Sequence, residues 1–437
     1  MNANLTYLKK KKLVLGIVLI FCLSIIITRW LNIPMDNPMY DPRSGIYGDV
    51  WSDLNVKSAA TYFRDHGFGK TAALPVFNYE GKGTEDRTFV YTHYPPLPDE
   101  LAGVVATITG SVDTRVLSIL PLCLSLVFFG LIFLSLQAYN PDNRLEAMLA
   151  GIFTVISCYY VCWADDIHQH VYGEFCKWLF VYLLYLYYTR PERRKGLLVA
   201  LCFLAFINTW ITFEHILYYG IVVAGFSLIF ERKLFTKVNV LLMLMPVLGL
   251  GLHVLQNYIY FGNWERVVQD ITGAYTERTI GKETDTLRIG PDEWAQIPSK
   301  IEERLNRMFF LGTVPTVGLS ILGFIKLWKD QRKLFWVGIV LFIASASWIF
   351  FMTQHTFIHY FTIRHFGLAY AFMVSWGISA LFQYFRMAKA RKWYWAMALC
   401  IIAGLLCFIP SLEYHFYHVY AKYAYMFPHL GDKTHYW

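Results

Sequence analysis

The stretch VLSILPLCLSLVFFGLIFLSLQA at residues 116–138 contains no charged residue. An α-helix needs about 20 mostly apolar residues to cross the hydrocarbon core of a membrane. We therefore predict a transmembrane helix here, and the same criterion gives about eleven such segments in the chain. They are residues 13–30, 116–138, 147–164, 175–189, 196–210, 213–230, 239–260, 308–326, 334–352, 366–384 and 394–411. Residues 196–230 also fit one long broken helix.

The composition of the whole chain agrees with this prediction. Of its 437 residues, 56% are apolar and only 16% are charged, with a mean hydropathy of +0.39. Soluble domains carry about 25% charged residues. The composition predicts an all-α integral membrane protein with a single transmembrane domain over residues 1–437. It excludes a disordered protein, a disulfide-rich secreted module and an ordinary cytosolic enzyme.

The basic residues predict the orientation in the membrane. With the N-terminal residues Lys9 to Lys12 in the cytoplasm, every even-numbered connection also faces the cytoplasm. The N-terminus and these connections together hold about half of the 39 lysines and arginines. The short outer loops hold one, Arg364. This matches the positive-inside rule, so the net charge of +8 reflects topology and does not indicate a nucleic-acid partner.

Three long segments are predicted to lie outside, at residues 31–115, 261–307 and 412–437. Connections this long are usually functional. Within the first, residues 50–65 and 99–109 show helical apolar spacing, which predicts two interfacial helices on the membrane surface. The second is rich in glycine and is predicted to be flexible. Twelve of the 13 histidines fall in outer segments or at outer helix ends, which favours a site at the outer face.

Two acidic residues, Asp49 and Asp53, follow the first predicted span. Four residues apart on a helix, they would share one face. A carboxylate held there could take a proton from a hydroxyl nucleophile. On spacing alone, the favoured interpretation is that Asp49 caps the helix.

The stretch Tyr91-Thr92-His93-Tyr94-Pro95-Pro96-Leu97-Pro98 combines polar rings with paired prolines. Prolines hold the preceding backbone extended, so they can orient Tyr91 and His93 toward a substrate. A rigid connection to the next interfacial helix is the alternative interpretation, and both can hold.

Residues 164–174 concentrate ionisable groups in a predicted short loop between two spans. The group comprises Asp165, Asp166, His168, His170 and Glu174. Asp166, His168, His170 and Glu174 could bind a divalent metal, but hydrogen bonding to a polar substrate is the favoured use. Lys177 follows one turn into the next span, where it could pair with Glu174 or meet an anionic headgroup.

A fourth pair, Glu214-His215, is as compatible with a structural role as with a functional one. The last group contains His355 and His359, which share a face if helical, and Arg364. A fixed arginine at a membrane surface suits a phosphate. Interfacial anchoring is the alternative.

Taken together, these motifs resemble the GT-C superfamily of polytopic membrane glycosyltransferases, especially the branch of the protein mannosyltransferases and aminoarabinose transferases. The resemblance rests on an acid soon after the first span, the stretch Tyr91 to Leu97, the acidic group at 165–174 and the histidines at 355–365. It covers the layout of about 400 residues, and Pro-Pro-Leu is its most specific motif. Relatives often carry two adjacent acids, whereas Asp49 and Asp53 are separated.

The resemblance implies a GT-C-like fold and an inverting transfer of a sugar from a polyprenyl phosphate of the undecaprenyl type. Either Asp49 or Asp53 would be the catalytic base. The donor phosphate would be bound by Lys177, His355, His359 and Arg364. The sugar or acceptor would be bound by Tyr91, His93, Asp165, Asp166, His168, His170 and Glu174. Because a phosphate leaves readily, no cofactor is required, although a divalent metal fits.

The acceptor expected first is a hydroxyl of an envelope glycan such as O-antigen or lipopolysaccharide, at the periplasmic face of a bacterial inner membrane. Transfer to lipid A or to an exported protein is the alternative within this reaction class. An O-antigen ligase or polymerase would usually carry more outer arginines. A lipid or polysaccharide exporter would need a polar route through the membrane, and the predicted spans contain little to line one.

Overall fold

The computed structural model describes residue 23 and residues 50–157, 159–160, 163–279, 291–309 and 314–387. The described chain is mostly helical. Its α-helices are α2 (Val50–His66), α3 (Leu97–Thr109), α4 (Thr114–Tyr139), α5 (Arg144–Val155), α7 (Gln169–Thr189), α8 (Arg194–Ile211), α9 (His215–Glu231), α10 (Lys237–Phe261), α11 (Trp264–Thr279), α12 (Pro291–Phe309), α13 (Val314–Asp330), α14 (Arg332–Phe351), α15 (Thr353–Ile358) and α16 (Gly367–Met387). The 3₁₀ turns are η3 (Gly69–Thr71), η4 (Glu85–Arg87), η5 (Pro191–Arg193) and η6 (Tyr360–Phe366).

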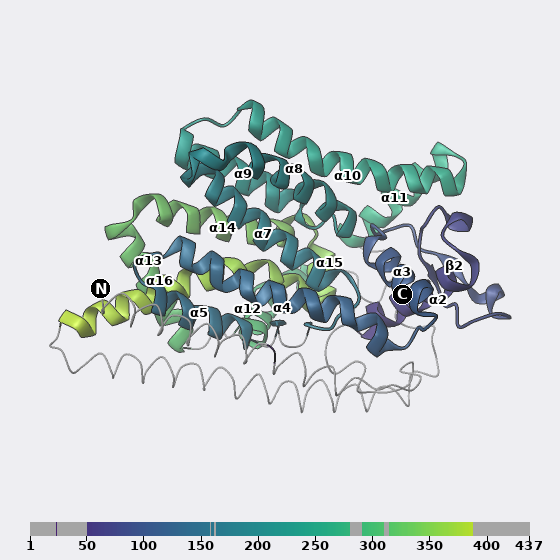
Figure 1. Ribbon diagram of the computed structural model, residues 1–437, viewed down its shortest axis with the longest axis horizontal. Helices are drawn as coiled ribbons and strands as arrows, with labels where there is room; N and C mark the ends of the chain where they lie inside the picture. The colour runs from purple at the N-terminus through teal and green to yellow at the C-terminus, as the bar shows by residue number, and fades with distance from the viewer. Residues whose placement is uncertain are drawn as a thin grey trace, which may run out of the picture.

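The long helices form a bundle that runs along the long axis of the molecule, with α2, α3 and a small hairpin at one end (Figure 1). Helix α16 packs against α13 and α5, α8 against α10 and α7, and α9 against α14. One large apolar core of aromatic and aliphatic side chains runs through these contacts. The hairpin pairs β1 (Val76–Phe77) with β2 (Phe89–Val90), antiparallel, with Val76 opposite Val90.

Among the described residues, five helical segments are long and apolar enough to cross a membrane. They are α4, α8, α10, α14 and the segment Phe361–Phe385, and α9 is a shorter apolar helix. This supports the prediction of a multipass membrane protein. The predicted spans 13–30 and 394–411 lie outside the described residues, so the total of eleven stays a prediction.

The predicted spans 196–210 and 213–230 are confirmed as two separate helices, α8 and α9, which are separated by the turn Thr212–Glu214. Two other predicted spans differ from the observed helices. The segment 147–164 is not one helix, because α5 ends at Val155 and the Ser157 hydroxyl then donates to the Thr154 carbonyl, which competes with helical pairing. In the segment 308–326, residues 308–309 belong to α12 and residues from Val314 onward to α13, while residues 310–313 lie outside the described residues.

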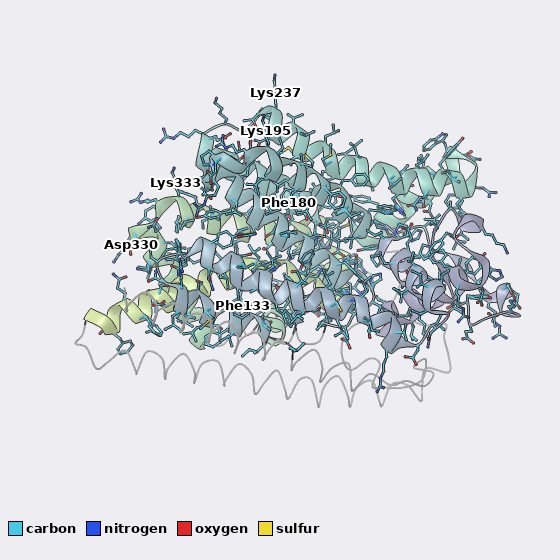
Figure 2. All side chains as sticks on the ribbon, viewed as in Figure 1. Phe133, Phe180, Lys195, Lys237, Asp330 and Lys333 are labelled. Carbon is cyan, nitrogen blue, oxygen red and sulfur yellow. The ribbon has the colours of Figure 1, made fainter. Side chains whose placement is uncertain are left out.

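Side chains of the basic connections lie toward the end of the bundle away from α2 and α3. Lys195, Lys237 and Lys333 are labelled there in Figure 2. The connections predicted to face the cytoplasm therefore lie away from the predicted interfacial helices. The orientation in the membrane itself stays a prediction.

Both predicted interfacial helices are confirmed as helices, α2 and α3, and they pack against each other. Their contact is built from small residues, including Ala60, Ala102 and Ala106, all buried. The ring of Phe63 lies so close to Gly103 that a Cβ there would be 2.6 Å from its Cδ2. The second outer segment contains α11 and α12, and its predicted flexibility stays a prediction.

Helices α13 and α16 approach each other through glycines. A Cβ added to Gly323 would overlap the carbonyl oxygen of Met373, and one added to Gly377 would overlap that of Leu319. Backbone atoms cannot swing away as side chains can. This contact therefore fixes the spacing of the two helices.

We expect Gly323→Ala to lower the stability of the protein by about 1–3 kcal/mol, because overpacking forces the helices apart. Gly318→Ala is the matched control in the same helix, since a Cβ there meets nothing within 4 Å. Thermal unfolding of both variants in lipid nanodiscs measures the difference. Equal midpoints for the two variants would contradict the close contact.

Helix α3 buries two neighbouring carboxyl groups, Asp99 and Glu100. Burial raises the pKa of Asp99 from 3.8 to about 8, with a further contribution from Glu100. Burial also raises the pKa of Glu100 to about 7, although Gln256 donates to its Oε1 at 3.0 Å. Asp99 Oδ1 has no hydrogen-bond partner among the described residues.

A raised carboxyl pKa means that the folded state binds this proton more tightly than the unfolded state. The stability from protonated Asp99 is therefore complete below about pH 4 and is lost as the pH rises toward 8. Asp99→Asn should flatten this decline and stabilise the protein at pH 8 by more than about 1 kcal/mol. Unfolding measured from pH 5 to 8 tests this. Asp86→Asn, at an exposed position, should leave the decline unchanged.

Candidate active site

A buried arginine, Arg364, organises the site. It lies in η6, and only 1% of its side chain is exposed. Its Nη1 donates to His170 Nδ1 at 2.7 Å, its Nη2 donates to Glu214 Oε2, and its Nε lies 3.9 Å from Glu174 Oε1. Because arginine cannot lose its proton, its burial requires carboxylates close by. Sequence analysis placed Arg364 at the membrane surface, and the structure places it inside the protein.

The other members of this buried charge cluster surround the two carboxylates. Lys177 donates to Glu174, as predicted, and also to the Arg364 carbonyl at 3.4 Å. His365 Nε2 lies 3.4 Å from Glu214 Oε2, and His215 Nε2 lies 3.9 Å from Glu174 Oε1. We define the cluster as His170, Glu174, Lys177, Glu214, His215, Arg364 and His365. Its two carboxylates balance the charge of its two basic side chains, Lys177 and Arg364, when all four are ionised.

Three separate elements supply the cluster: the first turns of α7, the turn before α9, and η6. In α7, His170, Glu174 and Lys177 share one face because they are three or four residues apart. Sequence analysis placed residues 164–174 in a loop between spans. The structure corrects this, since α7 begins at Gln169 and both His170 and Glu174 are helical and buried.

The stretch Tyr91–Pro98 docks onto the cluster. The Tyr94 hydroxyl donates to Glu214 Oε1 at 2.6 Å. The Thr92 carbonyl accepts from His253 and Asn257 of α10 at 2.9 and 3.1 Å. These contacts fix the stretch between the bundle and the interfacial helices, as the paired prolines suggested.

The two predicted substrate-binding rings of this stretch lie nearer the surface. His93 pairs with Asp270 of α11 at 3.1 Å and retains 28% side-chain exposure. Tyr91 stacks on Phe77 at 4.7 Å and lies 5.4 Å from His93, both measured between ring centroids. Helix α11 therefore closes one side of the site.

Asp53 joins the site through the loop before α7. Its Oδ1 accepts a hydrogen bond from the backbone amide of Ile167 at 3.0 Å. Asp166, which precedes Ile167 in the chain, accepts one from the backbone amide of His168 at 2.8 Å. Asp166 Oδ2 lies 4.0 Å from His170 Nε2. Asp53, the neighbouring Asp165–Asp166 pair and His170 thus lie together. Asp49 directly precedes α2 and lies outside the described residues.

His355 and His359 are brought together at α15, with ring centroids 4.6 Å apart. Trp348 donates to His355 Nδ1 at 3.3 Å. The Phe361 ring lies 4.6 Å from the His170 ring and 5.0 Å from the His359 ring. The candidates for the donor phosphate therefore lie beside those for the sugar.

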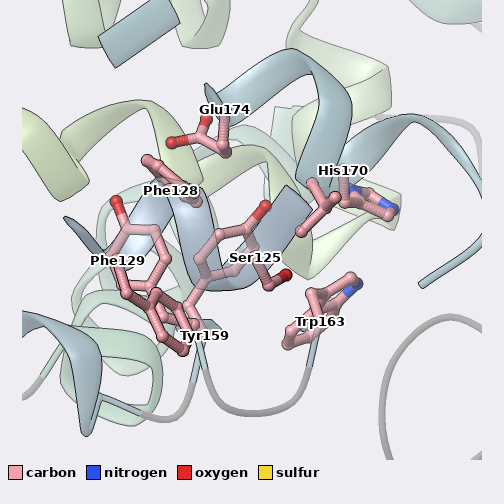
Figure 3. Close-up of a pocket in the computed structure, with 9 residues that line it drawn as sticks. Ser125, Phe128, Phe129, Tyr159, Trp163, His170 and Glu174 are labelled. Carbon is pink, nitrogen blue, oxygen red and sulfur yellow. The ribbon is translucent and has the colours of Figure 1, made fainter. Parts of the chain in front are cut away.

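A narrow pocket adjoins the cluster, with an empty volume of about 200 Å³ (Figure 3). Its walls are the aromatic rings of Phe128, Phe129, Tyr159, Tyr160 and Trp163, and it is also lined by His170 and Glu174. The enclosed space has room for roughly one water molecule, so a sugar ring does not fit without movement of the aromatic walls.

Two groups among the described residues bring three possible metal ligands within 4.8 Å of one another. One is Asp166, His168 and His170, and the other is Glu174, His215 and His365. The first contains three of the four residues predicted as metal ligands. The fourth, Glu174, falls in the second group.

No protein-family model and no curated protein matches the chain. Two solved structures do: ArnT from Cupriavidus metallidurans bound to undecaprenyl phosphate and the same protein in the apo state. Their TM-scores are 0.54 and 0.52, with 13% and 14% identity, and each match covers 93% of this chain and 76% of the other.

The chain has the GT-C fold. The predicted fold class is therefore confirmed. At such low identity the likeness concerns the fold, and the reaction has to be argued from the site.

Several residues of this site were not among those predicted to bind substrate or donor. Glu214 was noted without an assigned role. A carboxylate between two apolar segments destabilises the folded protein unless a cation or a hydrogen-bond donor pairs with it, which is a signal for a partner. His365 and Tyr94 lay within recognised motifs. Asp270 could not be recognised as a site residue from sequence, because α11 is polar along most of its length and one more acidic residue does not stand out there.

We expect Glu214→Gln to destabilise the protein by about 3–5 kcal/mol, because it leaves the buried Arg364 without its main counter-charge. Glu231→Gln is the matched control. Glu231 pairs with Arg194 at 3.8 Å with both side chains partly exposed, so its loss should cost no more than about 1 kcal/mol. Denaturant unfolding in nanodiscs compares the two. An equal loss in both would show that the buried pair has no special role.

Proposed function

We propose that the protein is an inverting glycosyltransferase that moves a sugar from a polyprenyl phosphate to a hydroxyl of an envelope glycan. One observation carries this proposal. The buried charge cluster brings the separate motifs of the sequence to one place: Tyr94 and Asp166 lie next to its members, and His359 lies next to Phe361, which packs on His170. The GT-C fold adds support, because one structural neighbour, ArnT, was solved bound to undecaprenyl phosphate, the kind of lipid phosphate that would leave in the proposed reaction.

The proposed reaction needs a base, and we assign it to Asp49. The base takes the proton of the acceptor hydroxyl, whose oxygen forms a bond to the anomeric carbon from the face opposite the phosphate. The bond between that carbon and the phosphate oxygen breaks, and the electron pair leaves with the lipid phosphate. One carboxylate oxygen of Asp53 accepts a hydrogen bond from the Ile167 amide. We therefore assign Asp53 a positioning role: it holds the loop at residues 165–168 in place.

The donor phosphate is proposed to lie near Phe361. His355 and His359 flank this ring, and the half-buried His359 is the more accessible of the two. Lys177 and Arg364 lie deeper, already paired with carboxylates, and would contribute electrostatically. A phosphate leaving group needs hydrogen-bond donors more than an acid, so the proposed reaction requires no metal.

The acceptor is proposed to be an envelope glycan such as O-antigen or lipopolysaccharide, at the outer face of a bacterial inner membrane. Helix α2, which contains Asp53, lies at one end of the bundle with β2 and α3, and the segment between β2 and α3 contains Tyr91 and His93 (Figure 1). A membrane-anchored glycan could reach this end along the membrane surface. We expect lipid A and peptide acceptors to compete poorly with it.

We expect Asp49→Asn to lower the rate of sugar transfer roughly 10²–10⁴-fold, because it removes the base and keeps the shape. The assay incubates the protein in nanodiscs with radiolabelled undecaprenyl-phosphate sugars and an envelope-glycan acceptor, and follows loss of the lipid-linked label. Asp53→Asn is the comparison and should retain more activity. An active Asp49→Asn beside an inactive Asp53→Asn would move the base to Asp53, and full activity in both would refute the mechanism.

A further inference from the structure

The contact between Arg364 and His170 fixes where His170 carries its proton. An arginine only donates hydrogen bonds, so His170 Nδ1, 2.7 Å from Nη1, must accept. An imidazole that accepts at Nδ1 is neutral and carries its hydrogen on Nε2. His170 is fully buried, and its Nε2 has no hydrogen-bond partner among the described residues.

This Nε2–H group faces a carboxylate across a gap. Asp166 Oδ2 lies 4.0 Å away, beyond the range of a direct hydrogen bond. A hydroxyl oxygen at about 2.8 Å from both atoms fits between them. It would accept from His170 Nε2–H and donate its own hydrogen to Asp166.

Other occupants fit this gap poorly. A metal ion needs a bare nitrogen, and Nε2 carries the hydrogen while Arg364 occupies Nδ1. A phosphate oxygen would meet the negative charge of Asp166. An ammonium group has no lone pair to accept from His170. A neutral group that donates and accepts at once matches both sides, as a water molecule does and as a sugar hydroxyl that displaces the water would.

We propose that Asp166 and His170 form a subsite that binds one hydroxyl group of the donor sugar, with Arg364 as the positioning residue that holds His170 as an Nε2–H donor. The inference rests on the proposed function for the identity of the ligand as a sugar. Two neighbours favour the donor. His170 lines the aromatic pocket, where the Trp163 ring centroid is 6.0 Å from its own, and it contacts Phe361 beside His359.

The first test needs no turnover. Solid-state ¹⁵N NMR of histidine-labelled protein in lipid reports the tautomer, and the signal of His170 is identified by its loss in His170→Gln. We expect a neutral ring protonated on Nε2, unchanged by added zinc or by EDTA. A bare Nε2 or a zinc-dependent shift would overturn the subsite and establish a metal site.

The second test compares two amide variants. The glutamine amide reaches the place of Nε2, so His170→Gln keeps a donor toward the gap. The asparagine amide reaches only the place of Nδ1, so His170→Asn keeps the partner of Arg364 and loses that donor. The substrate is the undecaprenyl-phosphate sugar that the wild-type protein turns over in the sugar-transfer assay. We expect kcat/KM for it to fall roughly 10²-fold in His170→Asn and less than about tenfold in His170→Gln. The reverse order would refute the role of Nε2–H.

The third test locates the hydroxyl. The wild-type protein should reject one deoxy analogue of the donor sugar by roughly 10²-fold, and Asp166→Asn should reduce this discrimination below about tenfold. Unchanged discrimination in Asp166→Asn would overturn the assignment. If no lipid-linked sugar is turned over, the proposed function fails, and the tautomer and zinc response of His170 still decide between a hydrogen-bond donor and a metal ligand.

Discussion

The burial of Arg364 is the constraint on which the site depends. A guanidinium inside a membrane protein is tolerated only when carboxylates and hydrogen-bond acceptors surround it. The acceptors here come from α7 and from the turn before α9, while the arginine comes from η6. These elements must meet before the charge is compensated. The same pairing places Tyr94, and with it the first outer segment, against the bundle.

The helices were largely predictable from sequence, because a membrane sets a minimum length for an apolar run. The runs at 116–138, 239–260 and 334–352 match α4, α10 and α14 closely. The failures occur where local chemistry overrides hydropathy. Ser157 interrupts the apolar segment that follows α5. Apolar content alone carries no information about this effect.

The site was predictable as a set of motifs on one face but not as a network. Glu214 and Arg364 are 150 residues apart, and nothing in either local sequence names the other as its partner. The burial of His170 and Glu174 was also missed, since a run of ionisable residues normally indicates a solvated loop. Their hydrogen bonds to Lys177 and Arg364, which only the tertiary structure shows, offset the free-energy cost of burying them.

The charge balance of the buried cluster determines how the cluster responds to a voltage across a membrane. A transmembrane voltage does work on net charge, about 2.3 kcal/mol per elementary charge for each 100 mV crossed. Glu174 and Glu214 cancel the charges of Lys177 and Arg364 within a few ångströms. A voltage therefore exerts almost no net force on the cluster. Its assembly is as favourable in a membrane without a voltage as in a polarised one.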